Sequence, residues 1–81
     1  MEYSDVIKNL NVIFCEIFDD YSIVIVPQMV AADLEQWDSL NNIRLMVRIE
    51  EIFGIVFDTS EFTSFANVGE LIKSIEGKTS R

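Results

Sequence analysis

Apolar residues recur at helical spacing over residues 3–18. Placed 100° apart, they fall in an arc about 140° wide, which is typical of an amphipathic helix packed on a core. The members of this arc are Tyr3, Val6, Ile7, Leu10, Ile13, Phe14, Ile17 and Phe18. The pattern predicts a first helix that ends at the acidic pair at residues 19–20. Cys15 lies opposite the centre of the arc and is expected to have no role in the core.

Residues 19–37 form a long connection that contains the only proline, Pro27. The aliphatic run at residues 23–26 could form a short strand, but no second β-pattern exists to pair with it. We therefore expect a packed loop or a helical turn, with Trp37 anchoring the end of the connection.

A second helix is predicted from the signals at its two ends. Asp38 is a favoured N-cap residue, and Gly54 directly follows Phe53 at the position where helices often end in a left-handed residue. The helix should therefore end at Phe53.

The remaining sequence predicts one short and one longer helix. Asp58 can cap a short helix over residues 59–64, and Asn67 with Glu70 three residues later resembles a capping box. The apolar stripe of this last helix is Val68, Leu71, Ile72 and Ile75. Together these elements predict an all-α fold: a small four-helix bundle over residues 1–81, with three longer helices, one short helix and a long first loop.

The second predicted helix carries two apolar stripes on nearly opposite sides. One is a core stripe made of Leu45, Met46, Ile49, Ile52 and Phe53, and the other is made of Leu40, Ile43 and Val47. A small bundle cannot bury both faces unless something covers the second. This second stripe is flanked by Arg44, Arg48, Glu50 and Glu51. It predicts a docking surface for another protein, or else a face that the long loop covers.

Charge and composition exclude several classes of function. The 81 residues include 14 acids and 6 bases, a net charge of −8. Nucleic-acid binding is disfavoured because it needs clustered cations. No apolar run approaches the roughly 20 residues that span a bilayer, and the acidic start does not resemble a signal peptide, so a cytoplasmic protein is expected.

The residue inventory also disfavours catalysis and metal binding. Histidine is absent, so no Ser-His-Asp or Cys-His machinery exists and a zinc site is improbable. Asp19, Asp20 and Asp33 lack the spacing of a calcium loop. A non-enzyme without a metal is therefore expected.

Ser39 stands in the first turn of the second predicted helix. It has no base to activate it, so a nucleophilic role is excluded. The free N–H groups and positive dipole end of a helix favour an attached anion, so the hydroxyl could carry a phosphate ester. By its chemistry alone, a serine at this position is more often an ordinary helix-start residue.

The motif Asp38-Ser39-Leu40, followed by an amphipathic helix closing in Glu-Glu-Ile-Phe-Gly-Ile over residues 50–55, resembles the acyl carrier protein family. The family motif is Asp-Ser-Leu before a helix that ends in a Glu-Glu-x-Phe-like stretch. The similarity extends over nearly the whole chain, from the long first helix and loop to a closing helix with a polar cap.

This resemblance implies that a phosphopantetheinyl transferase moves 4′-phosphopantetheine from coenzyme A onto Ser39, recognising Asp38 and Leu40. The thiol of that arm would carry acyl groups as thioesters to acyl-activating, condensing or acyltransferase enzymes of fatty acid, polyketide or specialised lipid biosynthesis. The protein would act as a monomer. A pocket for the acyl chain would be lined by Met46, Ile49, Phe53, Phe62 and Phe65.

Two features depart from the family pattern. Trp37 stands near where a glycine is usual, and Arg44 and Arg48 occupy a face on which fatty-acid carriers generally present acids or small residues. Docking would then involve Leu40, Ile43, Arg44, Val47, Arg48 and Glu51. The arginines predict a carrier for a dedicated pathway, unless they only form salt links with Glu51. An aminoacyl or peptidyl carrier and an unmodified helical interaction module remain as alternatives.

Overall fold

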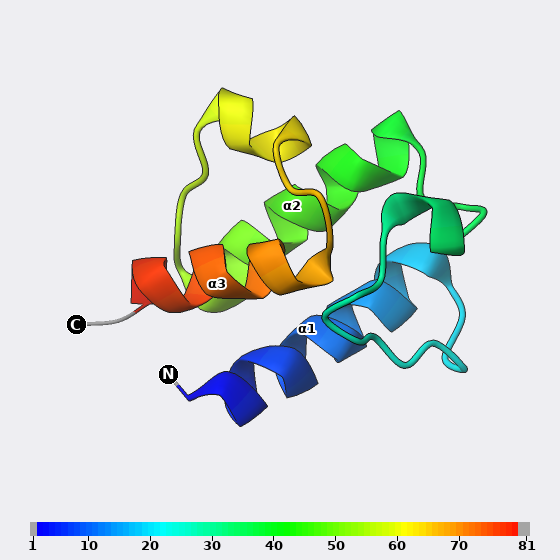
Figure 1. The fold of residues 1–81 in the computed structure, drawn as a ribbon, viewed down its shortest axis with the longest axis horizontal. Coiled ribbons are helices and arrows are strands. Elements are labelled where there is room, and N and C mark those ends of the chain that lie inside the picture. The colour runs from blue at the N-terminus through cyan, green and yellow to red at the C-terminus, as the bar shows by residue number, and fades with distance from the viewer. Residues whose placement is uncertain (1, 80–81) are drawn as a thin grey trace.

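A computed structural model describes residues 2–79, and every regular element in that range is helical (Figure 1). The elements are α1 (Tyr3–Phe18), η1 (Ala31–Asp33), α2 (Ser39–Phe53), η2 (Thr59–Thr63) and α3 (Val68–Thr79). The predicted all-α fold with a long first loop is confirmed. The short helix predicted over residues 59–64 is a 3₁₀ helix, held by the Glu61 carboxylate, which accepts the N–H of Asp58 at 2.8 Å.

Helix α1 has the predicted bounds, and its apolar arc forms one side of the core. It ends because Asp19 adopts a left-handed conformation with φ 51°, and the N–H of Asp20 then returns to the carbonyl of Cys15 at 3.0 Å. Tyr3, expected in the core arc, is instead 46% exposed. It is the first helical residue and lies at the edge of a groove beside Pro27 and Lys73, so the bundle covers only part of its ring.

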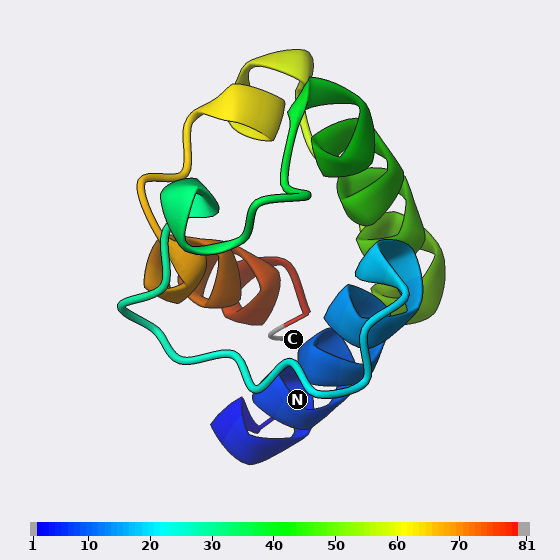
Figure 2. The same ribbon diagram turned by 90° about the vertical axis from the view of Figure 1, so that its right-hand side faces the viewer.

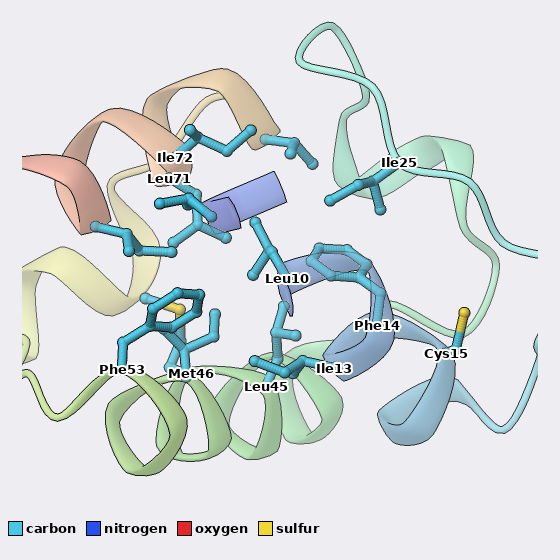
Figure 3. Close-up of a cluster of buried hydrophobic side chains, with 14 of the residues drawn as sticks. Leu10, Ile13, Phe14, Cys15, Ile25, Leu45, Met46, Phe53, Leu71 and Ile72 are labelled. Atoms are coloured by element: carbon cyan, nitrogen blue, oxygen red, sulfur yellow. The ribbon is translucent and has the colours of Figure 1, made fainter. Parts of the chain in front are cut away.

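The long loop covers a second side of α1, which corrects the expectation for Cys15. Cys15 is only 5% exposed, with its Sγ atom 3.6 Å from the carbonyl oxygen of Ile23. Asn11 fastens the loop: its Nδ2 donates to Ile23 O at 3.1 Å, and its Oδ1 accepts the N–H of Ile25 at 2.7 Å. Figure 3 shows Ile25 lying over Phe14 from the loop side. The segment is thus a packed loop, as predicted.

Helix α2 begins and ends as predicted and contributes Leu45, Met46, Ile49 and Phe53 to the core. Figure 3 shows Leu45, Met46 and Phe53 on its buried side. Gly54 follows with φ 66°, and its N–H donates to the carbonyl of Glu50 at 2.9 Å. Ile52 was expected in the core stripe but is 45% exposed. Ile52 lies at the edge of the core stripe, on the border between the buried and the solvent-facing sides of α2.

Helix α3 begins against the long loop, which satisfies its first N–H groups. The N–H of Val68 donates to Met29 O at 2.9 Å, and that of Gly69 to Pro27 O at 2.8 Å. Asn67 Oδ1 accepts the next helical N–H, as the capping box predicted, while the acidic partner Glu70 accepts the N–H of Ala66 instead of that of Asn67. The loop is therefore attached to α3 as well as to α1.

The three α-helices surround one core. Helix α1 packs against both α2 and α3, and η2 packs against α2. The beginning of α1 and the end of α3 lie at one end of the molecule, and the beginning of α2 lies at the other (Figure 1). Figure 2 shows α1 and α2 side by side, with α3 across from them and η2 beyond the start of α2. Within residues 2–79 no helix is long and apolar enough to cross a membrane.

Candidate functional site

The start of α2 is rigidly capped by Asp38. Its Oδ1 accepts the N–H of Asn41 at 2.8 Å, and its backbone carbonyl accepts the N–H of Asn42 at 2.8 Å. The cap fixes the first turn of α2, in which Ser39 is the first helical residue. The side chain of Ser39 therefore stands at a defined place, with the helix dipole directed toward it.

Ser39 is exposed, and its hydroxyl makes no hydrogen bond to another residue of the described range. The carboxylate beside it belongs to Asp38, which already accepts the N–H of Asn41. No histidine exists in the chain to remove the serine proton. The Ser39 hydroxyl is therefore accessible from outside the protein, and the chain has no histidine to activate it as a nucleophile.

Trp37 anchors the chain just before Ser39, as expected. Its indole ring packs edge-on against Phe14 at 5.3 Å between ring centroids, and its Nε1 donates to Asn42 Oδ1 at 3.0 Å. Aromatic packing of this geometry together with a satisfied indole N–H holds the ring in place. The segment that enters α2 is thus fixed from both sides of Ser39.

A cavity of about 760 Å³ opens beside Ser39, between the start of α2, η2 and the start of α3. Its lining includes Met46, Phe62 and Phe65 from the predicted acyl pocket. The other two residues predicted there, Ile49 and Phe53, are buried core residues that do not line this cavity. The lining combines apolar residues from α2, η2 and α3 with polar residues from the start of α2 and from η2.

Asn42 is a lining residue that the sequence reasoning missed. Besides accepting from Trp37, its Nδ2 donates to the backbone carbonyl of Phe62 at 2.6 Å. The available signal was its position: Asn42 lies one turn before Leu45 and Met46 on the core face of α2. A polar residue on a core face requires hydrogen-bond partners, and here the partners come from two other segments.

The second apolar stripe of α2 faces solvent. Leu40 is 66% exposed, Ile43 51% and Val47 43%, so the long loop does not cover this face. The three side chains stand on adjoining turns of one helix. They form a continuous apolar surface next to Ser39.

The two arginines beside this stripe differ in their partners. Arg48 approaches Glu16 of α1 at 3.8 Å and Glu51 at 3.4 Å, both exposed contacts of small energy. Arg44 donates to the neutral Asn41 Oδ1 at 3.0 Å and has no carboxylate within ion-pair distance among residues 2–79. Within residues 2–79, Arg44 is thus a cation without an acidic partner, and it lies beside an exposed apolar stripe.

Other acidic groups serve the local structure. Glu50 accepts the N–H of Phe57 at 2.8 Å, which fastens the chain after α2. The hydroxyl and the N–H of Ser22 both donate to the Asp20 carboxylate, and these bonds lower the pKa of Asp20. No three potential ligands are grouped for a metal ion in the described part of the chain.

Comparison with known proteins identifies the fold. No protein-family profile and no curated protein sequence matches the chain. Among solved structures, the chain is similar to a holo acyl carrier protein from Geobacter metallireducens determined by solution NMR. The TM-score is 0.87 and the sequences are 36% identical over 94% of this chain and 87% of that one. Similarity at this level over most of both chains shows that this protein belongs to the acyl carrier protein family.

Proposed function

We propose that Ser39 is the attachment point of 4′-phosphopantetheine and that this protein carries acyl groups as thioesters between enzymes. A general carrier role follows from the family. The observation that supports Ser39 is its exposed hydroxyl, uncommitted among the described residues, at the first position of α2 and at the rim of a largely apolar cavity. The similar solved structure is of a holo acyl carrier protein.

The residues at Ser39 fit such a group. The phosphate would lie at the positive end of α2, where the N–H groups of the first turn favour an anion. Asp38 is the nearest acid, and its carboxylate is turned to the N–H of Asn41. When bound, the group supplies a thiol on a flexible arm; the protein supplies its position.

The cavity is the proposed shelter for the cargo. Met46 contributes a flexible apolar side chain, and Phe62 and Phe65 contribute aromatic surface. Ile49 and Phe53 support these residues from the core. An acyl chain placed there would be removed from water, which is favourable in proportion to the apolar area covered.

The exposed stripe of Leu40, Ile43 and Val47 is the proposed docking surface for partner enzymes, with Arg44, Arg48 and Glu51 beside it. A phosphopantetheinyl transferase would recognise Asp38 and Leu40 on either side of its target, Ser39. Acyl-activating, condensing or acyltransferase enzymes would then meet the same face. Because Arg44 and Arg48 place positive charge on a face where fatty-acid carriers generally present acids or small residues, we propose that these enzymes belong to a dedicated pathway and not to general fatty acid synthesis.

Intact-mass measurement tests the attachment. The native chain, incubated with coenzyme A and a promiscuous transferase, should gain the mass of one phosphopantetheine group. The Ser39→Ala variant should gain nothing, and Ser60→Ala, which alters another exposed serine at a helix start, should behave like the native chain. If the native chain gained no mass, the attachment at Ser39 would be contradicted, and the alternative of an unmodified helical interaction module would remain. Loading by amino-acid-activating enzymes in place of acyl-activating ones would indicate an aminoacyl or peptidyl carrier.

A pair of charge reversals tests the docking surface. Arg44→Glu removes the unpaired cation, whereas Arg48→Glu removes contacts with Glu16 and Glu51 as well. Both should weaken productive encounters with the protein's own partner enzymes, measured as kcat/KM for acyl loading. Unchanged kinetics in both variants would contradict the proposal of a dedicated pathway.

A further inference from the structure

Two groups of aromatic side chains flank the Ser39 end of the cavity. The first group comprises Phe14, Phe18 and Trp37, with ring centroids 5.3 to 6.1 Å apart. The second comprises Phe57, Phe62 and Phe65, with Phe57 packing edge-on against the other two at 6.4 and 5.9 Å. Trp37 from the first group and Phe62 and Phe65 from the second line the cavity. The distance between the groups therefore decides how wide the cavity is at this end.

The amide of Asn42 joins the two groups. It accepts the indole N–H of Trp37 at 3.0 Å and donates to the carbonyl of Phe62 at 2.6 Å. Asn42 lines the cavity and lies three residues after Ser39, which places both on one side of α2. A single amide thus spans the cavity wall next to the proposed attachment point.

Both ends of this link are held independently. The indole of Trp37 packs against Phe14, and its backbone N–H donates to Leu34 O at 3.0 Å. On the other side, Glu61 fixes η2 by accepting from the N–H of Asp58 at 2.8 Å and by pairing with Lys78 of α3 at 3.2 Å. Moving Trp37 and Phe62 apart would therefore break a hydrogen bond of Asn42.

We propose that Asn42 is a positioning residue that sets the width of the cavity beside Ser39 and thereby makes this carrier favour straight acyl chains over chains branched next to the carbonyl. The proposal depends on the proposed role of Ser39. Cargo carried on an arm from Ser39 would enter the cavity past this braced end, and protein walls in close contact accept an extra methyl group only by shifting.

Two variants break the link at different points. Trp37→Phe removes the indole donor and keeps an aromatic ring against Phe14. Asn42→Asp keeps the size of the side chain and the acceptor for Trp37, but it places a carboxylate oxygen against the carbonyl of Phe62. Asn11→Asp is the matched control, because Asn11 also donates to a backbone carbonyl, that of Ile23, and it does not line the cavity.

Protection of two isomeric cargoes is the readout. Each protein is loaded with hexanoyl or 2-methylpentanoyl phosphopantetheine from the corresponding coenzyme A thioester. The rate at which hydroxylamine cleaves the protein-bound thioester is then compared with the rate for the free coenzyme A thioester, and the slowing on the protein is the protection. The native chain and Asn11→Asp should protect the straight chain about tenfold better than the branched one, which carries a methyl group beside the carbonyl. A factor of about ten is near the lower limit for a change of one methylene group in an apolar pocket. In Trp37→Phe and Asn42→Asp, the ratio of straight-chain to branched-chain protection should fall toward one.

The unloaded protein provides a second readout. Solvent exchange of the Asn42 side-chain amide protons, followed by NMR, should be slow in the native chain and in Asn11→Asp, and faster by at least about tenfold in Trp37→Phe because half of the link is gone. Equal exchange rates in these three proteins would overturn the proposal. A native chain that gains no mass would overturn this proposal and the carrier function together. If all four proteins were loaded and all showed the same preference in protecting the straight over the branched cargo, only the role of Asn42 would be overturned.

Discussion

Two glycines in α3 should respond oppositely to the same substitution. Replacing a helical glycine by alanine ordinarily stabilises a helix, because glycine has the larger conformational freedom to lose. At Gly77 an added Cβ meets nothing within 4 Å. At Gly69 the Cβ would stand 3.1 Å from Pro27 O and 3.1 Å from Asn67 Oδ1, both closer than ordinary van der Waals contact.

The structure sets the expected magnitudes. Gly77→Ala should raise the free energy of unfolding by up to about 1 kcal/mol, the helix-propensity difference. At Gly69 the same gain is opposed by displacement of the loop, which weakens the bonds to Pro27 O at 2.8 Å and Met29 O at 2.9 Å. Each such bond contributes about 0.5 to 1.5 kcal/mol. Gly69→Ala should therefore destabilise by about 1 kcal/mol, leaving the two variants about 2 kcal/mol apart.

Urea unfolding of the unloaded proteins, followed by circular dichroism, measures this difference. In a domain of this size 2 kcal/mol corresponds to roughly 8 to 16 °C between melting temperatures, so thermal unfolding gives an independent value. If Gly69→Ala proved as stabilising as Gly77→Ala, the loop would not be held against α3 at Pro27. The account of how the loop closes this side of the bundle would then be wrong.

Three further predictions concern the helix cap at Asp38, the carboxylate of Glu61 and the thiol of Cys15. Asp38→Ala should lower the free energy of unfolding by about 1 kcal/mol through loss of the bond to Asn41, whereas Asp38→Asn should retain most of it, as urea unfolding would reveal. The Asp58 N–H lowers the pKa of Glu61 below its ordinary 4.5, so its stabilising contribution is present at neutral pH and disappears as the pH falls through the lowered value. The stability gap between native chain and Glu61→Gln, measured by urea unfolding from neutral to acidic pH, should therefore close in acid. Cys15, buried beneath the loop, should react with an alkylating reagent far more slowly in the native protein than in urea; equal rates would mean that the loop does not cover it.

The helices were predictable because their signals are local. The periodicity of α1, the cap at Asp38 and the glycine after Phe53 each act within a turn or two of the chain, and each is found where predicted. The exposed hydroxyl of Ser39 and the exposed stripe beginning at Leu40 follow from the same local patterns.

The remaining features depend on contacts between distant segments. Cys15 is buried because the long loop crosses α1, and the sequence does not say which face a loop will cover. The role of Asn42 could not be predicted because its hydrogen-bond partners, Trp37 and the carbonyl of Phe62, come from two other segments of the chain. Residues 49 and 53 shared the apolar character of the pocket but not its position. Pattern distinguishes inside from outside more readily than it distinguishes core from cavity wall.

The positions of the outer ends of α1 and α3 have a practical consequence. The first and last described helical residues, Tyr3 and Thr79, lie at the end of the molecule opposite Ser39 (Figure 1). A solid support or a fluorophore joined to an exposed side chain at the outer end of α1 or α3 would therefore lie far from the serine. An immobilised form of this kind would leave Ser39 accessible for the transferase test of the proposed function.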